Sequence, residues 1–394
     1  MPNTLYDAVL AVDALTLVQS DSYNAFEKLK EYQTLTKDWI FGYLSYDLKN
    51  DVEDLVSNNF DGLEFPELFF FQPKKLFFLK GETMEAHYLN MVEDEWEDDL
   101  QQIQNLKNTP KSRLVVEPPI KIKSRISPSD YISKVGKLLD HIHRGDIYEA
   151  NFCQEFYAEN SQINPLDVYF RLNTISKPPF ASFFKNDNFF ALSASPERYL
   201  KKMGLKVISQ PIKGTARRSE NKTEDNDLVK NLRNDPKERS ENIMIVDLVR
   251  NDLSKTAVKG SVTVEELCKI YSFEQVHQMI STVSSIVKPN THPVDVLQST
   301  FPMGSMTGAP KISAMKLIEE LEKTKRGLYS GSIGYFSPSG DFDFNVVIRS
   351  ILYNTLKRYL SFSVGSAITS KSLPDKEFEE CIIKSEAMHE VLKK

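Results

Sequence analysis

The order of apolar and polar positions along the chain predicts four main helices, each introduced by a proline. Behind Pro128, for example, apolar residues recur every three or four positions, and Gly145 is expected to end the helix. Proline suits the first turn of a helix, because the N–H that it lacks has no partner there in any case. The predicted helices cover Ser127–Gly145, Pro236–Leu253, Pro310–Leu321 and Pro374–Leu392.

Short runs rich in apolar, β-branched and aromatic residues predict strands between these helices. Phe273–Val287 is largely apolar and remains ambiguous between strand and helix, and the polar segment Ser219–Asp227 is predicted to be a mobile loop. Because the elements follow no regular strand–helix–strand rhythm, we expect an α+β fold and not a doubly wound sheet. The expected strands are Trp39–Tyr46, Leu68–Leu79, Asp146–Tyr157, Phe189–Ser193, Tyr199–Lys202, Lys206–Ser209, Tyr329–Phe336, Asp343–Tyr353 and Leu360–Ile368.

Prolines and charge divide the chain into two predicted parts. Residues 1–107 form a strand-rich N-terminal module that ends in the acidic segment Val92–Leu106, an expected helix with a solvated face. Asn108–Pro119 contains three prolines and is interpreted as a linker. Residues 120–394 form the second predicted domain, which carries the candidate catalytic chemistry.

Composition argues against several classes of function. The chain has 49 Lys and Arg against 55 Asp and Glu, a net charge of −6, so no basic surplus is available to hold a nucleic acid. We find no signal or transit peptide and no apolar run of about 18 residues, so no membrane span is expected. The three cysteines are far apart, which favours reduced thiols and a cytoplasmic location over disulfides or a zinc site.

Lys213 is the first candidate for chemistry. It lies between Pro211, which fixes its own backbone angle, and Gly214, which permits a turn, so the lysine is expected on a short, stiff element. An amine is a nucleophile only when it is neutral, and with an unperturbed pKa of about 10.4 few lysines are neutral at pH 7. Burial or a nearby cation would lower that pKa. The alternative is an ordinary surface lysine after a strand.

Carboxylates from two distant places suggest a metal site. Glu377, Glu380 and Lys384 are spaced so that all three share one face of the last predicted helix. Glu241, on the helix that follows Pro236, is a third carboxylate. Carboxylate oxygens near a cleft suit Mg²⁺, which usually keeps several of its waters. The alternative is an exposed ladder of ion pairs.

Four further residues are candidate acid–base or binding groups. Glu197 lies in a tight connection between strands and would act as a general acid if burial raised its pKa; otherwise it pairs with Arg198 on the surface. Gly308 precedes a helix whose free N–H groups would hold a carboxylate, or it is part of a plain cap. Arg349, in the middle of an apolar strand, needs either a substrate carboxylate or a structural Asp or Glu. Tyr329 offers a hydroxyl, or is a core tyrosine.

As a set, these stretches resemble the family of chorismate-utilising enzymes. They follow the family's order from about residue 145 to 384, and Phe41–Asp47 extends the match weakly into the N-terminal module. The resemblance implies a large two-layered α+β body with facing antiparallel sheets, outer helices and a central active-site cleft. The matching stretches are Gly145–Tyr148, Ser195–Arg198, Pro211–Thr215, Glu241–Asp252, Met306–Lys311, Gly331–Phe336 and Glu377–Lys384.

Within this family, a lysine at the position of Lys213 is typical of members that aminate chorismate at C4, whereas anthranilate and isochorismate synthases have alanine there. The resemblance therefore implies a covalent adduct on the path to p-aminobenzoate and folate, in which Lys213 attacks ring C2 and Glu197 is the general acid. It also implies Mg²⁺ held by Glu241 and Glu380, with Glu377 adjacent. The implied substrate-binding residues are Arg349, Tyr329, Lys384, Gly365, Thr215 and Gly308.

The resemblance further implies a partner and leaves alternatives open. Ammonia would come from a separate glutamine amidotransferase subunit, because nothing in the chain resembles a Cys–His glutaminase. The alternatives are anthranilate or isochorismate synthase activity, or a non-catalytic partner or regulatory protein that keeps the fold. The N-terminal module would either hold a small ligand, as in related subunits, or form a plain core.

Three positions depart from the pattern of the family. Gln278 stands where a histidine is usual, and this would remove a partner for the C4 oxygen. Glu149 replaces the usual glutamine and adds a carboxylate near C2, which either keeps Lys213 charged or, when protonated, donates a hydrogen bond. The glycine run near the C-terminus is replaced by Gly365–Ala367.

Overall fold

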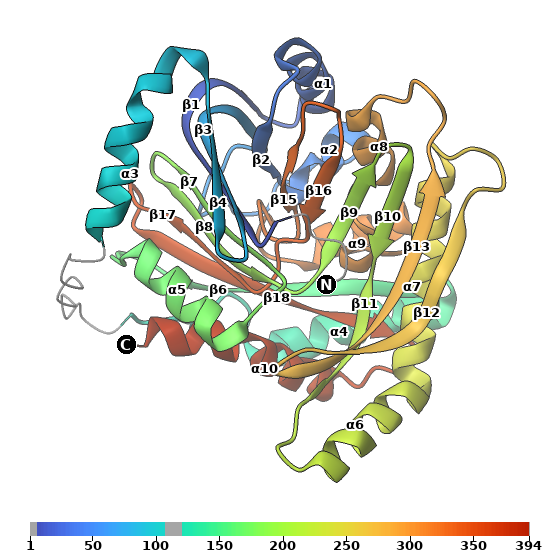
Figure 1. The fold of residues 1–394 in the computed structure, drawn as a ribbon. Coiled ribbons are helices and arrows are strands. Elements are labelled where there is room, and N and C mark those ends of the chain that lie inside the picture. The colour runs from blue at the N-terminus through green and yellow to red at the C-terminus, as the bar shows by residue number, and fades with distance from the viewer. Residues whose placement is uncertain (1–5, 107–119, 394) are drawn as a thin grey trace.

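Two antiparallel sheets form the framework of the structure, a computed structural model that describes residues 6–106 and 120–393 (Figure 1). Among these residues the larger sheet has eleven strands and the smaller sheet seven. The larger sheet runs in the order β1 (Ala8–Ser20), β3 (Leu68–Lys80), β2 (Ile40–Leu44), β15 (Ser332–Phe336), β16 (Phe342–Asn345), β9 (Arg198–Met203), β10 (Lys206–Gln210), β13 (Val276–Ile286) and β11 (Ile212–Arg217), with β4 (Thr83–Tyr88) beside β3 and β12 (Thr263–Ser272) beside β13. The smaller sheet runs in the order β14 (Gly308–Ala309), β6 (Glu149–Ala158), β18 (Tyr359–Thr369), β17 (Ser350–Asn354), β8 (Phe189–Ser195) and β7 (Phe180–Asn186), with β5 (Lys123–Ser124) beside β6.

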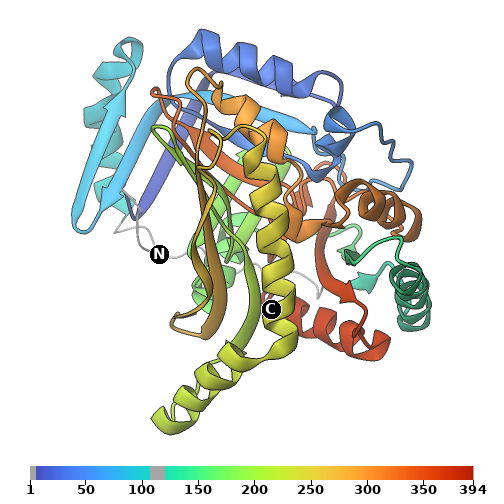
Figure 2. The ribbon, with the colours of Figure 1, turned by 90° about the vertical axis from the view of Figure 1, so that its right-hand side faces the viewer.

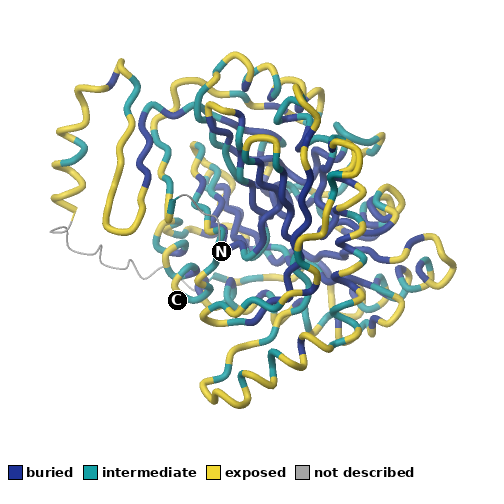
Figure 3. Tube along the Cα trace, turned by 45° about the vertical axis from the view of Figure 1, so that its right-hand side comes forward, coloured by how far each residue is buried: buried dark blue, intermediate teal, exposed yellow. Residues whose placement is uncertain are grey.

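The two sheets face each other across a shared apolar core. Leu200 and Phe344 of the larger sheet belong to the same buried cluster as Ala191 and Leu352 of the smaller one. A second cluster, which includes Phe152, lies on the other face of the smaller sheet, against helices. The burial map shows the same arrangement, with buried residues concentrated in the central strands (Figure 3). The predicted two-layered α+β body with outer helices is therefore confirmed.

Helices cover the outer face of the smaller sheet and flank the larger one (Figure 2). Helix α6 projects from the body below β11 in both ribbon views (Figures 1 and 2). Within the described residues, no helix is both long and apolar enough to cross a membrane. The helices on the smaller sheet are α4 (Pro128–Arg144), α5 (Pro165–Ser176), α9 (Lys311–Leu321) and α10 (Pro374–Leu392), and the others are α1 (Ala25–Thr36), α2 (Lys49–Val52), α3 (Trp96–Asn105), α6 (Lys222–Asn234), α7 (Pro236–Ser254) and α8 (Pro293–Thr300).

The alternation of side chains along β6 decides which residues reach the space between the sheets. Ala150 and Phe152 pack into the cluster beneath the helices. Because successive strand residues point to opposite faces, Glu149, Asn151 and Cys153 are turned toward the larger sheet, and Cys153 does belong to the core between the sheets.

Strands from both predicted parts of the chain share the larger sheet. In this sheet β2 pairs with β15, with Gly42 opposite Gly334. Tyr43 of β2 also packs edge-on against Phe184 of the smaller sheet, with ring centroids 5.1 Å apart. The predicted linker Asn108–Pro119 lies outside the described residues, and the division into two domains stays a prediction.

The sequence signals at helix ends are confirmed by the structure. The Ser127 hydroxyl accepts a hydrogen bond from the backbone N–H of Asp130 at 3.1 Å and so caps α4. Gly145 ends this helix in the left-handed conformation, with φ of 87°. Helices α7, α9 and α10 likewise begin at or directly after their predicted prolines.

Three local predictions are settled or corrected by the structure. The mobile loop predicted for Ser219–Asp227 is wrong from Lys222 onward, because the side chain of Asn221 caps α6 and a helix forms even in this polar stretch. The ambiguous segment Phe273–Val287 contains strand β13. Gly308 precedes helix α9 as predicted, and it lies in the short strand β14, which the sequence analysis did not predict.

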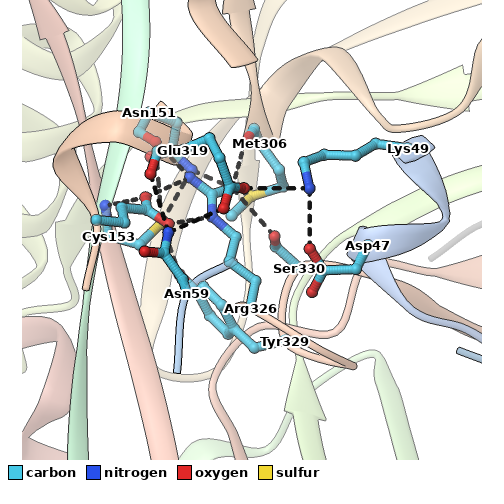
Figure 4. A network of polar contacts seen from close by, with 11 residues as sticks. Asp47, Lys49, Asn59, Asn151, Cys153, Met306, Glu319, Arg326, Tyr329 and Ser330 are labelled. Atoms are coloured by element: carbon cyan, nitrogen blue, oxygen red, sulfur yellow. Dashed lines mark hydrogen bonds and ion pairs between the residues drawn. The ribbon is translucent and has the colours of Figure 1, made fainter. Parts of the chain in front are cut away.

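A buried ion pair ties the N-terminal segment to the rest of the chain (Figure 4). Nζ of Lys49 lies 2.9 Å from Oδ1 of Asp47 and 3.3 Å from Oε2 of Glu319. The other oxygen of Asp47 accepts a hydrogen bond from the backbone N–H of Gly327 at 2.8 Å. Both side chains of the Lys49–Asp47 pair are almost fully buried. Removal of one partner would therefore leave an uncompensated charge in the interior.

We expect Lys49→Met to lower the free energy of unfolding by about 3–5 kcal/mol, because it strands the buried carboxylate of Asp47. Urea denaturation of the purified variant measures the change. A matched control is Lys30→Met, since Lys30 pairs with Asp295 at 2.7 Å but about a third of each side chain is exposed. The control is expected to change stability by less than about 1 kcal/mol. Equal losses in the two variants would contradict this account.

Candidate active site

Four elements bring one lysine and three glutamates together between the sheets. Lys213 is the second residue of β11, Glu197 lies in the connection from β8 to β9, Glu241 is in α7, and Glu149 is the first residue of β6. The lysine side chain is 13% exposed, and the three glutamates are buried. Each of the three carboxylates acts electrostatically on the lysine amine. The structure therefore brings together Lys213, Glu197 and Glu241, which the sequence analysis selected from separate motifs.

The amine of Lys213 is charged in this setting. Its Nζ lies 3.1 Å from Oε1 of Glu149 and donates a hydrogen bond to it. Burial alone would lower the pKa of Lys213, but the charges of Glu149 and Glu241 outweigh burial and raise the pKa above its usual value. The expected net fall of this pKa is therefore wrong for the free protein, and the alternative that Glu149 keeps Lys213 charged is confirmed. Any nucleophilic role then requires a proton acceptor.

Glu197 has the properties of a general acid near neutral pH. Its backbone N–H donates to the hydroxyl of Ser195 at 3.2 Å, within the tight connection that leads to β9. Burial raises the pKa of Glu197 to about 7, although a hydrogen bond with Ser305 and the charge of Lys213 both lower it. At this pKa the carboxyl both holds and releases a proton at neutral pH.

The surface ion pair considered as an alternative for Glu197 does not form. Arg198 turns instead to Asp343, and its Nε and Nη2 donate to the two carboxylate oxygens at 2.9 and 3.0 Å. Its Nη1 donates to the side chain of Gln210 at 2.7 Å. The carboxyl of Glu197 is thus free of an arginine partner and lines a pocket together with Ser305.

Two of the predicted metal carboxylates converge on Lys237, a residue that the sequence analysis missed. Nζ of Lys237 lies 3.4 Å from Oε1 of Glu377 and 3.9 Å from Oε1 of Glu241. Glu380 pairs with Lys384 one turn further along α10, at 2.6 Å. Helices α7 and α10 therefore bring the three carboxylates to one region, where they are balanced by two lysines. The alternative of an exposed ladder of ion pairs applies only to Glu380 and Lys384, because Glu377 is buried.

These carboxylates differ in how readily they take up a proton. Burial raises the pKa of Glu241 to about 7, although the charge of Lys213 lowers it. Burial would also raise the pKa of Glu380, but the charge and hydrogen bond of Lys384 bring it below its usual value.

The chemistry of this donor set fits a hard cation. Among residues 6–106 and 120–393, no three acidic, histidine or cysteine side chains are close enough to hold a metal as they stand. However, Oε1 of Glu241 is buried and has no hydrogen-bond donor. A carboxylate oxygen of this kind, with Glu377 beside it and only a flexible lysine to balance both, is a ligand that Mg²⁺ prefers.

Arg349 is not in the middle of a strand, and this prediction is wrong. Strand β16 ends at Asn345 and β17 begins at Ser350, so Arg349 lies in the crossing from one sheet to the other, with a left-handed φ of 54°. Its Nη1 donates to the backbone oxygen of Lys384 at 2.7 Å. Within the described residues no carboxylate lies within 4.0 Å of the guanidinium, so a structural Asp or Glu partner is absent there. Burial lowers the pKa of Arg349, and a partly buried cation of this kind favours an incoming anion.

Tyr329 is buried and lies at the edge of a dense polar network (Figure 4). Its hydroxyl is 3.6 Å from the thiol of Cys153, which, like the other two cysteines, is buried and free. Behind it Arg326 forms a two-pronged ion pair with Glu322, with Nε and Nη2 at 2.9 and 2.7 Å from the two oxygens. The same guanidinium donates to the backbone oxygens of Met306 and Asn151 and to the hydroxyl of Ser330. One arginine thus fixes the segment before Gly308, strand β6 and the turn that carries Tyr329.

The remaining predicted substrate-binding residues fall into two groups. Gly365 faces the site on β18, and Nζ of Lys384 donates to its backbone oxygen at 2.9 Å. Gly308 pairs with Ala150 on β6, and a side chain there would come within 2.1 Å of the backbone oxygen of Glu149. Thr215 pairs with Gln278 of β13 but is exposed, two residues beyond Lys213. Gly365, Lys384 and Gly308 therefore adjoin the site, whereas Thr215 is at its outer edge.

Sequence reasoning missed Lys237, Ser305 and Arg326. Lys237 follows Pro236 and reads as an ordinary first-turn lysine, and Arg326 belongs to the basic run Lys323–Arg326, which is typical of a surface. Their roles depend on contacts with residues more than a hundred positions away, such as Glu377 and Asn151. Only Ser305, next to the Met306 motif, carried a local signal.

The fold and the site together define a chorismate-utilising enzyme. The family model described as "chorismate binding enzyme" matches residues 7–390, almost the whole chain. The protein belongs to this family.

The named relatives include both an anthranilate synthase-like protein and an aminodeoxychorismate synthase. The chain is 32% identical over 366 residues to the anthranilate synthase component I-like protein of Synechocystis sp., which corresponds to 93% of this chain and 74% of that protein. It is 36% identical over 258 residues to aminodeoxychorismate synthase component 1 of Escherichia coli, or 66% of this chain and 56% of that protein. The crystal structure of anthranilate synthase component I from Streptococcus pneumoniae TIGR4 superimposes with a TM-score of 0.84 at 25% identity, over 99% of this chain and 93% of that one.

We expect Gly365→Ala to destabilise the protein by about 1–3 kcal/mol and to weaken chorismate binding. The new methyl group would lie 2.7 Å from the thiol of Cys153 and 2.8 Å from the side-chain oxygen of Asn151. Thermal unfolding and calorimetric titration with chorismate measure the two effects. The control is Gly136→Ala in α4, where nothing lies within 4 Å of the added methyl; it is expected to stabilise the helix by up to about 1 kcal/mol. A Gly365→Ala protein as stable as wild type would contradict the close packing.

Proposed function

We propose that this protein is an aminodeoxychorismate synthase component I, which converts chorismate and ammonia into 4-amino-4-deoxychorismate for p-aminobenzoate and folate synthesis. The observation that supports it most is the position of Lys213, whose amine touches Glu149 and faces Glu197 and Glu241. A covalent displacement needs a nucleophile and a proton for the leaving group. The buried amine supplies the first and the neighbouring proton donor supplies the second.

In the proposed reaction Lys213 attacks ring C2 while the C4 hydroxyl leaves. Glu197, with its pKa near 7, donates a proton to that hydroxyl so that it departs as water. Ammonia then attacks C4 and expels the lysine from C2. Two allylic displacements thereby replace one difficult exchange, which is the usual advantage of covalent catalysis.

Substrate binding is assigned to the cations and backbone groups around this centre. Arg349, which has no carboxylate partner among the described residues, would hold the enolpyruvyl carboxylate with the hydroxyl of Tyr329. Lys384 and the backbone at Gly365 would hold the ring end. Gly308 and Thr215 complete the proposed set at the edge of the site.

We assign Mg²⁺ to Glu241 and Glu380, with Glu377 adjacent. When bound, the ion would supply the positive charge that a ring carboxylate needs among so many glutamates. Lys237 would then lose its ion pairs with Glu241 and Glu377. Its ammonium is able to move out to the solvent, because the side chain has a flexible four-carbon stem and is already 40% exposed.

Ammonia is proposed to come from a separate glutamine amidotransferase subunit in the cytoplasm. Relatives such as the Escherichia coli protein are named "component 1", which supports a second component. The match covers only 56% of the length of the Escherichia coli protein, so its name alone does not establish a partner for this chain. The partner subunit is therefore proposed together with the reaction.

Anthranilate synthase activity is the second candidate. It is favoured by the 32% identity to the Synechocystis anthranilate synthase component I-like protein and by the superposition on the Streptococcus pneumoniae enzyme. It makes no use of the buried amine of Lys213, so we rank it below amination at C4.

The assay that decides between the two combines purified protein, chorismate, Mg²⁺ and ammonium, with products identified by mass spectrometry. We expect 4-amino-4-deoxychorismate from the wild type. We also expect Lys213→Ala to bind chorismate but to lose product formation by three orders of magnitude or more, roughly the scale seen when a nucleophile is removed. Lys206→Ala is the control and should retain activity, because this lysine lies on β10, which β13 separates from β11, and its side chain is 41% exposed. Anthranilate as the sole product would reject the proposed reaction.

The proposed acid role of Glu197 predicts a fall in activity as pH rises past about 7, because the carboxyl must carry a proton to give. The rate of adduct formation without ammonia, followed between about pH 6 and 9, measures this limb without interference from the titration of ammonium. In Glu197→Gln the rate should drop by roughly 10²–10⁴ and the limb should disappear. The same alkaline limb in that variant would assign it to another group.

A further inference from the structure

The carboxylate of Glu149 is placed to do more than balance a charge. Within the described residues it is the only carboxylate within 4.0 Å of the Lys213 amine, at 3.1 Å. The side chain is 1% exposed. Its second oxygen, Oε2, is buried and has no hydrogen-bond partner. A buried carboxylate with one oxygen on the amine and the other unused has the capacity to accept a proton.

The backbone of Glu149 is held on both sides. Glu149 opens β6 and pairs with Ala309 on one side and Thr369 on the other. The close approach of β14 depends on Gly308, where any side chain would collide with the backbone oxygen of Glu149. The side chain of Glu149 therefore starts from a fixed point, from which its carboxylate reaches the amine of Lys213 at 3.1 Å.

The other charged groups around Lys213 are less suited to take its proton. Glu197 must carry a proton of its own for the leaving hydroxyl. Glu241 is farther than 4.0 Å from the amine and already faces Lys237. Glu238 and Glu380 act on Lys213 only through longer-range electrostatics. Among the residues that the structure describes, Glu149 is therefore the only neighbour in hydrogen-bond contact with the amine that is free to accept.

We propose that Glu149 is the general base that takes a proton from the Lys213 ammonium and so makes the amine a nucleophile. This inference rests on the proposed amination of chorismate. Glu149 touches the reacting nitrogen, so it would be a catalytic residue and not a support for one.

The protons and electron pairs balance through the cycle. Lys213 gives one proton to Glu149, and its lone pair forms the bond to C2. Both ring double bonds shift along the conjugated path C2–C1–C6–C5–C4, the C4–O bond breaks, and Glu197 protonates the leaving oxygen to give water. Ammonia then bonds to C4, both double bonds shift back and the C2–N bond breaks, which releases Lys213 as an amine. Lys213 recovers its proton from Glu149, and the aminated product returns one to Glu197.

Substrate binding supplies the reason for the transfer to occur. In the free protein the charged pair is the resting form, as the raised pKa of Lys213 requires. When the substrate expels water, two opposite charges in a dry site become costly, and the neutral amine beside a neutral carboxyl gains relative to the ion pair. Because the proton already lies on a hydrogen bond, its transfer needs no rearrangement.

The test compares Glu149→Gln and Glu149→Asp with wild type in single-turnover formation of the Lys213–chorismate adduct, detected by mass spectrometry. We expect Glu149→Gln to bind chorismate within about threefold of wild type but to form adduct about 10²–10⁴ times more slowly. Above neutrality the ratio of its rate to the wild-type rate should rise about tenfold per pH unit, since its lysine must then lose its proton to solvent while both proteins share the falling limb of Glu197. Its own rate is therefore expected to stay level above pH 7 where the wild-type rate falls, and Glu149→Asp, which keeps a carboxylate, should recover part of the rate.

Glu238→Gln is the matched control, because Glu238 is a neighbouring glutamate of α7 that does not touch the amine, and it should form adduct at close to the wild-type rate. A Glu149→Gln rate within threefold of wild type would overturn the base, and so would a loss that is equal at every pH, which indicates positioning only. If wild type itself forms no adduct, the proposed function fails and the base fails with it. A wild-type adduct with an unaffected Glu149→Gln rejects the base alone.

Discussion

The constraint on which this structure depends is the balance of charge in a site that excludes water. Glu149, Glu197, Glu241 and Glu377 are all buried, and each ionised carboxylate must find a cation or keep a proton. Lys213 and Lys237 supply positive charge to three of them, and burial raises the pKa of Glu197 to about 7 although the charge of Lys213 lowers it. The charges of the set act on one another, since Lys213 lowers the pKa of both Glu197 and Glu241.

A second polar network, centred on Arg326, adjoins this charged site, and all of the donors of Arg326 are hydrogen-bonded. Arg326 uses Nε and both terminal nitrogens, and its partners come from a helix end, a strand and a turn. The difference between the two networks is informative. Arg326 has no unused donors and suits a structural role, whereas within the described residues Glu149 and Glu241 each keep a buried oxygen that has no hydrogen bond. Unsatisfied polar atoms of this kind are costly to the fold alone and are typical of sites that complete their contacts with a ligand.

Much of the architecture could be predicted from the sequence, because the signals for it are local. Prolines, the Ser127 cap and Gly145 set the helix ends, and the family resemblance indicated two facing sheets and the motif that carries Lys213. What failed depended on distant contacts. Arg349 looked like a strand residue because its neighbours are apolar, but the chain crosses between sheets there in a left-handed conformation. For Lys213 the sequence left two outcomes open, a pKa lowered by burial or a charge kept by Glu149, and only the structure decides between them, because the two residues are 64 positions apart and on opposite sheets. The partners of Lys237 and Arg326 were invisible for the same reason.

The pairing of β2 with β15 has a consequence for how the molecule is made. Strand β2, near position 42, pairs with β15, near position 334, so the larger sheet is continuous only after both have been synthesised. Helix α10, which carries Glu377 and Glu380, is synthesised later still. On the ribosome, the early strands therefore emerge long before the edge that will cover them, and closure of such distant contacts is slow. The growing chain remains without a complete catalytic centre until α10 has left the exit tunnel, and its aromatic-rich strand β2 lacks its partner until β15 has emerged.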